Sequence, residues 1–372
     1  MLYNTETKQT ISEKELEYNQ KLFEQVSDSN FEFNALRGVL KREEWKPVLG
    51  SCFFVYPEMK VDEKRGVITD PVFTPSIINS PNLQTFLDAA LAFFEQFKDK
   101  QIGVQLSGGL DSSLIIGLLK YFDIPFHLVG MTSERYEFRT ERYIQNLLAS
   151  WGDKVALLDF ESYLPLNQIN QVPFHPYPDL SVNNSASDNA MATVSNELGI
   201  EVLLTGEGGD NLFAESISYN VKDCTWKPQV FGDYWNTKYV YNPKGVELVS
   251  FYADKGIMNA VFNIRKGQAE DNNKIWARQY FKEFLPRELV DFTYCADFWG
   301  LYVDGLLNAL PTIEELFKNA KTVTNNKAFS QSEFDRLFGQ DLLEAKKEMY
   351  QQIEARVALA AWINSVTDKI SK

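Results

Sequence analysis

The chain has 372 residues, of which 44% are hydrophobic and 24% charged, and its formal net charge is −14. At about 150 residues per domain, this length predicts two or three structural units with ample apolar content for a large core. The acidic balance disfavours nucleic acid as a partner, because no run of Lys or Arg forms a basic patch. No stretch approaches the roughly 18 apolar residues that span a bilayer, and no secretory signal precedes the first helix, so we expect no membrane contact.

Cysteine and histidine usage bounds the chemistry further. The three cysteines (Cys52, Cys224 and Cys295) form no CxxC pair, and the two histidines lie far apart at His127 and His175. A disulfide framework and a tetrahedral zinc site are therefore disfavoured, and a reducing, cytoplasmic setting is expected. Cys295 and His127 are expected to be structural, whereas His175 lies in a proline-rich segment that could line a crevice.

The N-terminal unit, residues 1–98, is expected to contain little of the main fold. Residues 1–30 are polar and predict a helix preceded by a loose end. The apolar pieces 48–55 and 66–73, separated by a charged bend at residues 62–65, predict a β-hairpin. Apolar residues at helical spacing over 82–97 predict an amphipathic helix.

Strands and helices then alternate through a second unit, residues 99–215. Short apolar runs predict strands at 102–106, 126–131, 154–160 and 201–206, and helices at 112–122, 141–151 and 188–198 lie between them. Asp188 is a good candidate for the N-cap of the last of these helices. Such alternation is typical of a doubly wound parallel sheet. The third unit, residues 216–372, is mainly helical and includes predicted helices at 273–285 and 342–366.

The strongest local motif is Leu106-Ser107-Gly108-Gly109-Leu110-Asp111-Ser112-Ser113, between a predicted strand and a predicted helix. Adjacent glycines allow close approach of a ligand, and the hydroxyls and the free N–H groups of a helix start suit a phosphate or pyrophosphate. Asp111 would repel such a ligand unless a divalent cation joins them, which indicates Mg²⁺. The alternative is a glycine turn capped by Ser and Asp. The chain has no Walker-type loop, which disfavours γ-phosphoryl transfer.

A second motif, Thr205-Gly206-Glu207-Gly208-Gly209-Asp210-Asn211-Leu212-Phe213, follows the last predicted strand. Ligands of doubly wound sheets bind beyond the carboxyl ends of the strands, so both loops should face one crevice. Asp111 and Asp210 would then supply two carboxylates to one metal ion. Glu207 would project into the same crevice as a polar or basic group near a reacting carbonyl. The alternative is a glycine-rich turn that bears solvated acids.

The pair SGGLDSS and GEGGDNLF resembles the synthetase domain of asparagine synthetase and its relatives, β-lactam synthetase and lasso-peptide cyclases. More broadly, it resembles the PP-loop ATP pyrophosphatase superfamily, which implies an adenine nucleotide α-hydrolase fold with a helical C-terminal lobe. The resemblance is strong over about residues 100–215. It implies catalytic roles for Glu207, Asp210 and Asp111, and Mg²⁺ bound by Asp111 and Asp210. By the same resemblance, the residues that bind ATP are Leu106, Ser107, Gly108, Gly109, Asp111, Ser112, Ser113, Gly206 and Gly208, with adenine near Val129 and Met131.

In that family, a substrate carboxylate attacks the α-phosphate of ATP, pyrophosphate leaves, and a nitrogen nucleophile displaces AMP to give an amide. Amidotransferase members carry a cysteine nucleophile where this chain has Leu2, so we expect no glutamine hydrolysis in this chain. The nitrogen would come from free ammonia, from a partner, or from an amine of the substrate.

The sequence departs from the family in two places, the second loop and the C-terminal segment. Asn211 and Ala214-Glu215 replace the usual Glu and glycines of the second loop. The family Lys that follows a Leu-Pro step is replaced near Tyr294, which Thr293 and Cys295 flank. Another cation would then have to stabilise the transition state, and the candidates are Lys227, Lys274, Arg278 and Arg287.

The sequence therefore predicts an ATP-dependent, AMP-forming ligase that forms an amide or lactam from a small-molecule or peptide carboxylate in specialised metabolism. One alternative is a nucleotide-binding, non-catalytic partner subunit, which loss of the family Lys favours. The other is a PP-loop enzyme of sulfur transfer or tRNA modification, which the lack of CxxC pairs and of a basic face disfavours. The oligomeric state cannot be read from the sequence.

Overall fold

The computed structural model describes residues 2–4, 9–11, 52–54, 60–62, 67–69, 76, 78, 81–173, 180–214, 236–265, 273–291, 298–324, 327–339 and 347–370. Structural statements below refer to these residues. Of residues 1–30, where a helix was predicted, all but 2–4 and 9–11 lie outside the described residues, as do His175, Lys227, Thr293, Tyr294 and Cys295.

The N-terminal region contains short antiparallel strands. β1 (Leu2–Asn4) pairs with β2 (Gln9–Ile11) and with β3 (Cys52–Phe54), whereas β4 (Lys60–Asp62) pairs with β5 (Val67–Thr69). The loose end predicted at the start of the chain is therefore wrong over these residues, because they pair as strands. The predicted strand at 66–73 is confirmed as β5, but its predicted pairing with 48–55 is wrong. β5 pairs with β4, and the 48–55 segment contains β3, which pairs with β1.

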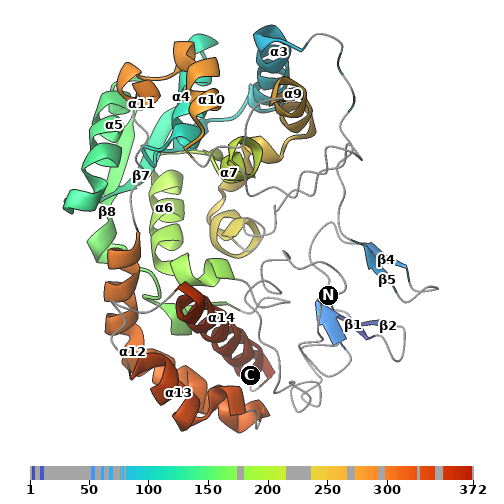
Figure 1. The fold of residues 1–372 in the computed structure, drawn as a ribbon, viewed down its shortest axis with the longest axis vertical. Helices are drawn as coiled ribbons and strands as arrows, with labels where there is room; N and C mark the ends of the chain where they lie inside the picture. The colour runs from blue at the N-terminus through green and yellow to red at the C-terminus, as the bar shows by residue number, and fades with distance from the viewer. Residues whose placement is uncertain are drawn as a thin grey trace.

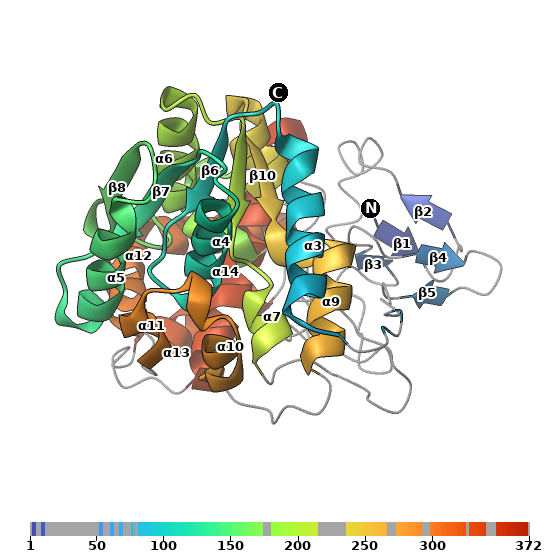
Figure 2. The same cartoon turned by 90° about the horizontal axis from the view of Figure 1, so that it is seen from above.

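A five-stranded parallel sheet forms the centre of the fold (Figures 1 and 2). Its strands are β6 (Ile102–Gln105), β7 (His127–Thr132), β8 (Val155–Asp159), β9 (Val202–Thr205) and β10 (Glu247–Ser250), in the spatial order β10-β9-β6-β7-β8. The chain moves from β6 outward to β7 and β8 and then returns to the other side of β6. The order of the strands thus reverses between β6 and β9, which in this fold type is where ligands bind.

The predicted strands and helices of residues 82–206 are confirmed with small shifts at their ends. The helices are α3 (Leu83–Phe94), α4 (Leu110–Tyr121), α5 (Arg139–Ala149) and α6 (Ser185–Glu197). The prediction that the strand at 201–206 is the last one is wrong, because β10 adds a fifth strand beside β9. β10 is short and only partly buried, so its hydrophobic pattern is weak in the sequence.

Two hydrophobic layers cover the two faces of the sheet. Successive side chains of a strand point to opposite faces, and β9 follows this rule. Val202 and Leu204 pack with α3, α4 and α9 (Lys255–Arg265), whereas Leu203 packs with residues of α6, α12 (Trp299–Thr324) and α14 (Lys347–Ile370). In Figures 1 and 2, α3 and α9 lie side by side. Within the C-terminal part, α12 and α14 therefore cover one face of the sheet, whereas α9 packs on the other.

Shorter helices complete the described chain. They are α7 (Gly209–Phe213), α10 (Ile275–Tyr280), α11 (Arg287–Asp291) and α13 (Gln331–Phe338). The helix predicted at 273–285 is confirmed as α10 followed by a 3₁₀ turn at Lys282–Phe284, and the one at 342–366 as α14. None of the described helices is both long and apolar enough to cross a membrane.

Candidate active site

The two glycine-rich loops meet at the reversal point of the sheet. β6 and β9 are parallel neighbours, so the loops that follow them leave the same edge. A Cβ atom added to Gly209 would lie 2.3 Å from Cγ of Asp111, and one added to Gly206 would lie 3.0 Å from the backbone nitrogen of Ser112. This packing requires glycine at both positions. Acidic turns that lie about a hundred residues apart in the sequence thus touch each other.

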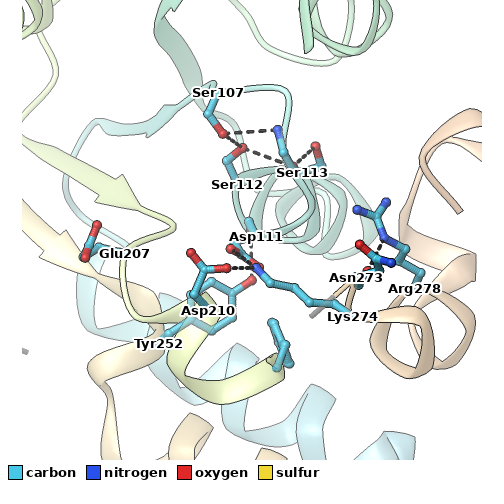
Figure 3. A network of polar contacts seen from close by, with 12 residues as sticks. Ser107, Asp111, Ser112, Ser113, Glu207, Asp210, Tyr252, Asn273, Lys274 and Arg278 are labelled. Carbon is cyan, nitrogen blue, oxygen red and sulfur yellow. Dashed lines mark hydrogen bonds and ion pairs between the residues drawn. The ribbon is translucent and has the colours of Figure 1, made fainter. Parts of the chain in front are cut away.

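The amine of Lys274 joins the two loop carboxylates (Figure 3). Its Nζ atom lies 2.6 Å from Oδ2 of Asp111 and 2.5 Å from Oδ1 of Asp210. The side chains of Lys274 and Asp111 are 10% and 18% exposed, whereas that of Asp210 is 77% exposed and faces solvent. Lys274 comes directly before α10, and its backbone adopts the left-handed conformation with φ +55°.

Charge and burial act in opposite directions in this cluster. Burial raises the pKa of the Asp111 carboxyl, and the Lys274 ammonium offsets only part of that increase. Burial lowers the pKa of Lys274, but the two carboxylates outweigh it and hold that pKa above its ordinary value. Lys274 therefore stays protonated, and the positive charge is fixed between Asp111 and Asp210.

Of the four replacement cations that the sequence suggests, Lys274 is the one that reaches the described loops. Arg278 is buried, and its guanidinium donates to the carbonyl oxygens of Asn273 and Leu289. Arg287 is exposed and lies near Asp291. Lys227 lies outside the described residues.

The first loop forms a hydroxyl-lined turn before α4. Gly108 has φ +83°, which favours glycine, and the hydroxyl oxygens of Ser107 and Ser112 are 2.8 Å apart. The backbone N–H of Gly109 donates to the Ser107 hydroxyl, and the Ser113 hydroxyl donates to the Gly109 carbonyl at 2.6 Å. The α4 helix begins without a side-chain cap, so the N–H groups of its first turn remain available to an anion.

A tyrosine from beyond the predicted ATP-binding unit supports this loop. Tyr252 follows β10, is buried, and donates its hydroxyl to the backbone carbonyl oxygen of Asp111 at 2.8 Å. Burial raises the pKa of the Tyr252 hydroxyl well above its ordinary value, and the charge of Asp111 adds to this shift. Neither Tyr252 nor its contact with Asp111 could be predicted from the sequence, because no local pattern marks either.

At the expected adenine position, backbone groups tie β6 to β7. The Leu106 N–H donates to the carbonyl of Val129, and the Gln145 amide donates to the carbonyls of Leu106 and Met131 at 3.0 and 2.7 Å. Leu106 and Val129 are fully buried, whereas Met131 is partly exposed. Their expected part in ATP binding therefore concerns Met131 and the loop backbone more than the side chains of Leu106 and Val129.

Glu207 lies on the second loop but apart from the Lys274 cluster, on the other side of Asp210 in Figure 3. Its side chain is exposed, and its backbone carbonyl oxygen accepts a hydrogen bond from the Ser250 hydroxyl at 2.8 Å. Gly208, the next residue, has φ +83° and turns the chain into α7. Glu207 thus lies apart from the two Lys274-bound carboxylates.

Asp188 is placed differently from the N-cap prediction. α6 starts at Ser185 with Asn184 as its N-cap, so Asp188 lies inside the first turn. Its side chain is buried, and burial together with the charge of Glu207 raises the pKa of its carboxyl to about 8. The prediction failed because the helix begins three residues earlier, at a run of small polar residues that has no helical periodicity.

Three comparisons with known proteins show what this chain is similar to. The asparagine synthase family matches residues 95–246, a segment that contains β6 to β9 and both loops. A search of the curated proteins gives no match. Among solved structures, NMN synthetase from Francisella tularensis is similar, with 13% sequence identity and a TM-score of 0.30, over 76% of this chain and 95% of that chain.

The matched segment covers less than half of the chain, and no glutaminase domain is evident in the described residues. The five-stranded parallel sheet confirms the predicted doubly wound α/β fold. Residues 95–246 are therefore similar to the asparagine synthase family.

Proposed function

We propose that the protein activates a carboxylate as an acyl-adenylate, with release of pyrophosphate, and then transfers the acyl group to an amine or ammonia to form an amide or lactam. The observation that carries this proposal is the contact between the two loops, with Asp111, Asp210 and Lys274 at the reversal point of the sheet. Attack at the α-phosphate requires the departing pyrophosphate to be stabilised, and this cluster lies where the triphosphate would bind.

The residues present fit a bound Mg²⁺ ion. Oδ1 of Asp111 is buried and has no hydrogen-bond partner, and Asp210 is exposed beside it. Two carboxylates suit Mg²⁺, which takes its remaining ligands from phosphate and water, and the described residues offer no group of three or more ligating side chains. When bound by Asp111 and Asp210, the ion would neutralise phosphate charge.

In the first half-reaction, side chains and backbone groups of the protein would bind the phosphates and stabilise the departing pyrophosphate. The hydroxyls of Ser107, Ser112 and Ser113 and the first N–H groups of α4 would bind the phosphates. The Lys274 ammonium lies close enough to the same loop to stabilise negative charge that develops on the departing group. A carboxylate and an amine held beside this loop would react faster through proximity alone.

The products distinguish this reaction from other uses of ATP. We expect the protein, incubated with ATP, Mg²⁺ and candidate carboxylates, to release AMP and pyrophosphate, measured by chromatography of the nucleotides. Release of ADP and phosphate would contradict the proposal. The substrate class, a small-molecule or peptide carboxylate in specialised metabolism, remains a prediction from the sequence.

The competing proposal is a nucleotide-binding partner subunit without activity of its own. The variant Asp210→Ala separates the two, assayed for ATP binding and for AMP release. In a ligase, the variant loses turnover by at least about a hundredfold, as expected for loss of a group that stabilises transition-state charge. If the unmodified protein binds ATP but releases no AMP with any carboxylate, the partner-subunit proposal is favoured.

A further inference from the structure

A group of buried polar side chains lies at the start of α6, outside the phosphate loops. Asn183, Ser185 and Asp188 are 3%, 3% and 6% exposed. Both side-chain atoms of Asn183, the Ser185 hydroxyl and Oδ2 of Asp188 are buried without a hydrogen-bond partner. Buried polar atoms in proteins are almost always paired, so three such residues within six positions indicate a place where a ligand supplies the partners.

The topology places this group at the carboxyl edge of the sheet. α6 directly precedes β9, so the helix runs opposite to the strand and begins at the edge where β9 ends in Thr205. Ser185 and Asp188 are three residues apart, which puts them on one face of the helix. The Asp188 carboxyl is close enough to Glu207, on the second loop, for the two charges to interact.

The charges indicate what kind of ligand fits. Burial and Glu207 both disfavour the ionised form of Asp188, and no positive charge of the described residues acts on it. Lys274, the cation of the loops, is held by Asp111 and Asp210. A carboxylate or phosphate ligand would add a third negative charge here, whereas a cationic nitrogen would supply the missing countercharge. The N-terminal end of α6 further stabilises a carboxylate at Asp188 once its countercharge is bound.

We propose that Asp188 binds the ammonium group of the nitrogen nucleophile, next to Glu207, and accepts a proton from it. The proton transfer rests on the proposed ligase function, whereas the binding of the ammonium group does not. The same chemistry serves free ammonium and a primary amine of the substrate.

Amide formation involves two proton transfers from the nitrogen and the exchange of one C–O bond for a C–N bond. Binding of the ammonium first releases the proton of the Asp188 carboxyl to solvent. A proton then passes from the bound ammonium nitrogen to Oδ2 of the ionised Asp188, which frees the nitrogen lone pair. The nitrogen attacks the carbonyl carbon of the acyl-adenylate, and a C–N bond forms. The C–O bond to the phosphate then breaks, and AMP leaves with its electron pair. Glu207 takes the second nitrogen proton, and both carboxyls later return their protons to solvent.

The binding test needs no carboxylate substrate. Thermal unfolding is measured in ammonium chloride and in methylammonium chloride, each against sodium chloride at equal ionic strength, for the unmodified protein and for Asp188→Asn. We expect both ammonium salts, or one of them, to raise the melting temperature of the unmodified protein above its value in sodium chloride, and Asp188→Asn to lose this difference. The salt that acts identifies free ammonium or a primary amine as the source.

Glu197→Gln is the matched control, because Glu197 lies on the same helix at its other end and is exposed. This variant should keep the full response. Equal melting temperatures in sodium and ammonium salts, or an unchanged response in Asp188→Asn, would overturn the proposal. Asp188→Asn keeps the side-chain shape and removes a buried acid, so it is expected to fold.

Turnover then separates this proposal from the proposed function. With a carboxylate that supports AMP release, Asp188→Asn should form the amide from ammonium or amine at least about tenfold more slowly. It should still trap the acyl-adenylate with hydroxylamine, which is uncharged at neutral pH. A variant with normal amide formation overturns the role of Asp188 and leaves the ligase intact. A protein that responds to ammonium but never releases AMP overturns the ligase instead.

Discussion

Lys274 shows how one side chain determines the electrostatics of the candidate site. Its backbone lies in the left-handed region, which costs a non-glycine residue roughly 1 kcal/mol or more. Two short ion pairs to Asp111 and Asp210 compensate for that strain. Without the ammonium, a buried carboxyl and its carboxylate neighbour would repel each other.

Lys274→Met should therefore destabilise the protein and stop the reaction. Removing one partner of a largely buried ion pair costs about 3–5 kcal/mol, and the exposure of Asp210 places the expected loss of unfolding free energy near the lower end of that range. Urea unfolding measures it, and AMP release should fall by at least about a hundredfold. Lys282→Met, at an exposed lysine nearby, should change neither quantity; equal effects of the two variants would contradict a specific role for Lys274.

Asp188 makes stability depend on pH. Its carboxyl has an ordinary pKa of 3.8 and a pKa of about 8 in the folded protein, because of burial first and Glu207 second. Between these values, the folded protein keeps a proton that the unfolded chain has lost. The contribution of Asp188 to the free energy of unfolding thus falls as pH rises, by up to about 1.4 kcal/mol per pH unit.

Asp188→Asn removes this dependence. We expect the free energy of unfolding of Asp188→Asn, relative to the unmodified protein, to increase steadily from pH 5 to pH 8 in urea titrations. Below the ordinary pKa of the carboxyl, both forms of the side chain are neutral and the difference should level off. A difference that stays constant from pH 5 to pH 8 would show that the Asp188 carboxyl titrates normally.

At the scale of the elements, the site depends on how closely α7 packs against α4. The contact is made by Gly209 against Asp111, with no room for a Cβ atom between them. The two helices start at the ends of neighbouring strands, so each loop limits where the other can go. The close approach explains the glycines at positions 206 and 209 of the second loop.

Gly209→Ala should separate the two loops. Its Cβ atom would overlap the Asp111 side chain, and forcing extra atoms into a packed site costs about 1–3 kcal/mol. ATP binding with Mg²⁺, measured by calorimetry, should weaken by at least about tenfold. Gly199→Ala is the control: it has open space but φ +79°, so it should lose stability through backbone strain and keep ATP binding. Normal ATP binding by Gly209→Ala would mean that the loops need not touch.

For the whole molecule, the C-terminal helices are a structural requirement of the sheet. Trp362 on α14 is fully buried and belongs to the same core as Leu203 of β9 and Val129 of β7. Residues beyond 215 also supply the fifth strand, Tyr252 and Lys274. Neither the sheet nor the candidate site is complete without them.

Trp362→Ala should therefore lower the stability of the whole protein. Loss of a fully buried tryptophan costs about 3–5 kcal/mol, and the unfolding transition should shift as a single step to lower urea concentration, followed by circular dichroism. Tyr143→Ala, at a half-exposed aromatic side chain, should change the midpoint little. Two separate transitions in Trp362→Ala would indicate that the helical cover unfolds independently of the sheet.

Local sequence was sufficient for the parallel sheet, for most helices of residues 82–206 and for the two acidic loops. Each of these depends on periodicity, on glycine at a turn, or on the rule that parallel strands end at one edge. The contact between the loops follows from the same rule.

Tertiary structure alone decided the rest. Lys274 lies 163 residues from Asp111, and its nearest neighbours in the sequence contain no motif, so only the packing of α10 selects it over Arg278 and Arg287. β10 was missed because a short edge strand has little hydrophobic pattern. The environment of Asp188 depends on the position of α6 relative to the second loop. Local patterns determine which elements form, but burial and charge at a site depend on residues that only the folded chain brings together.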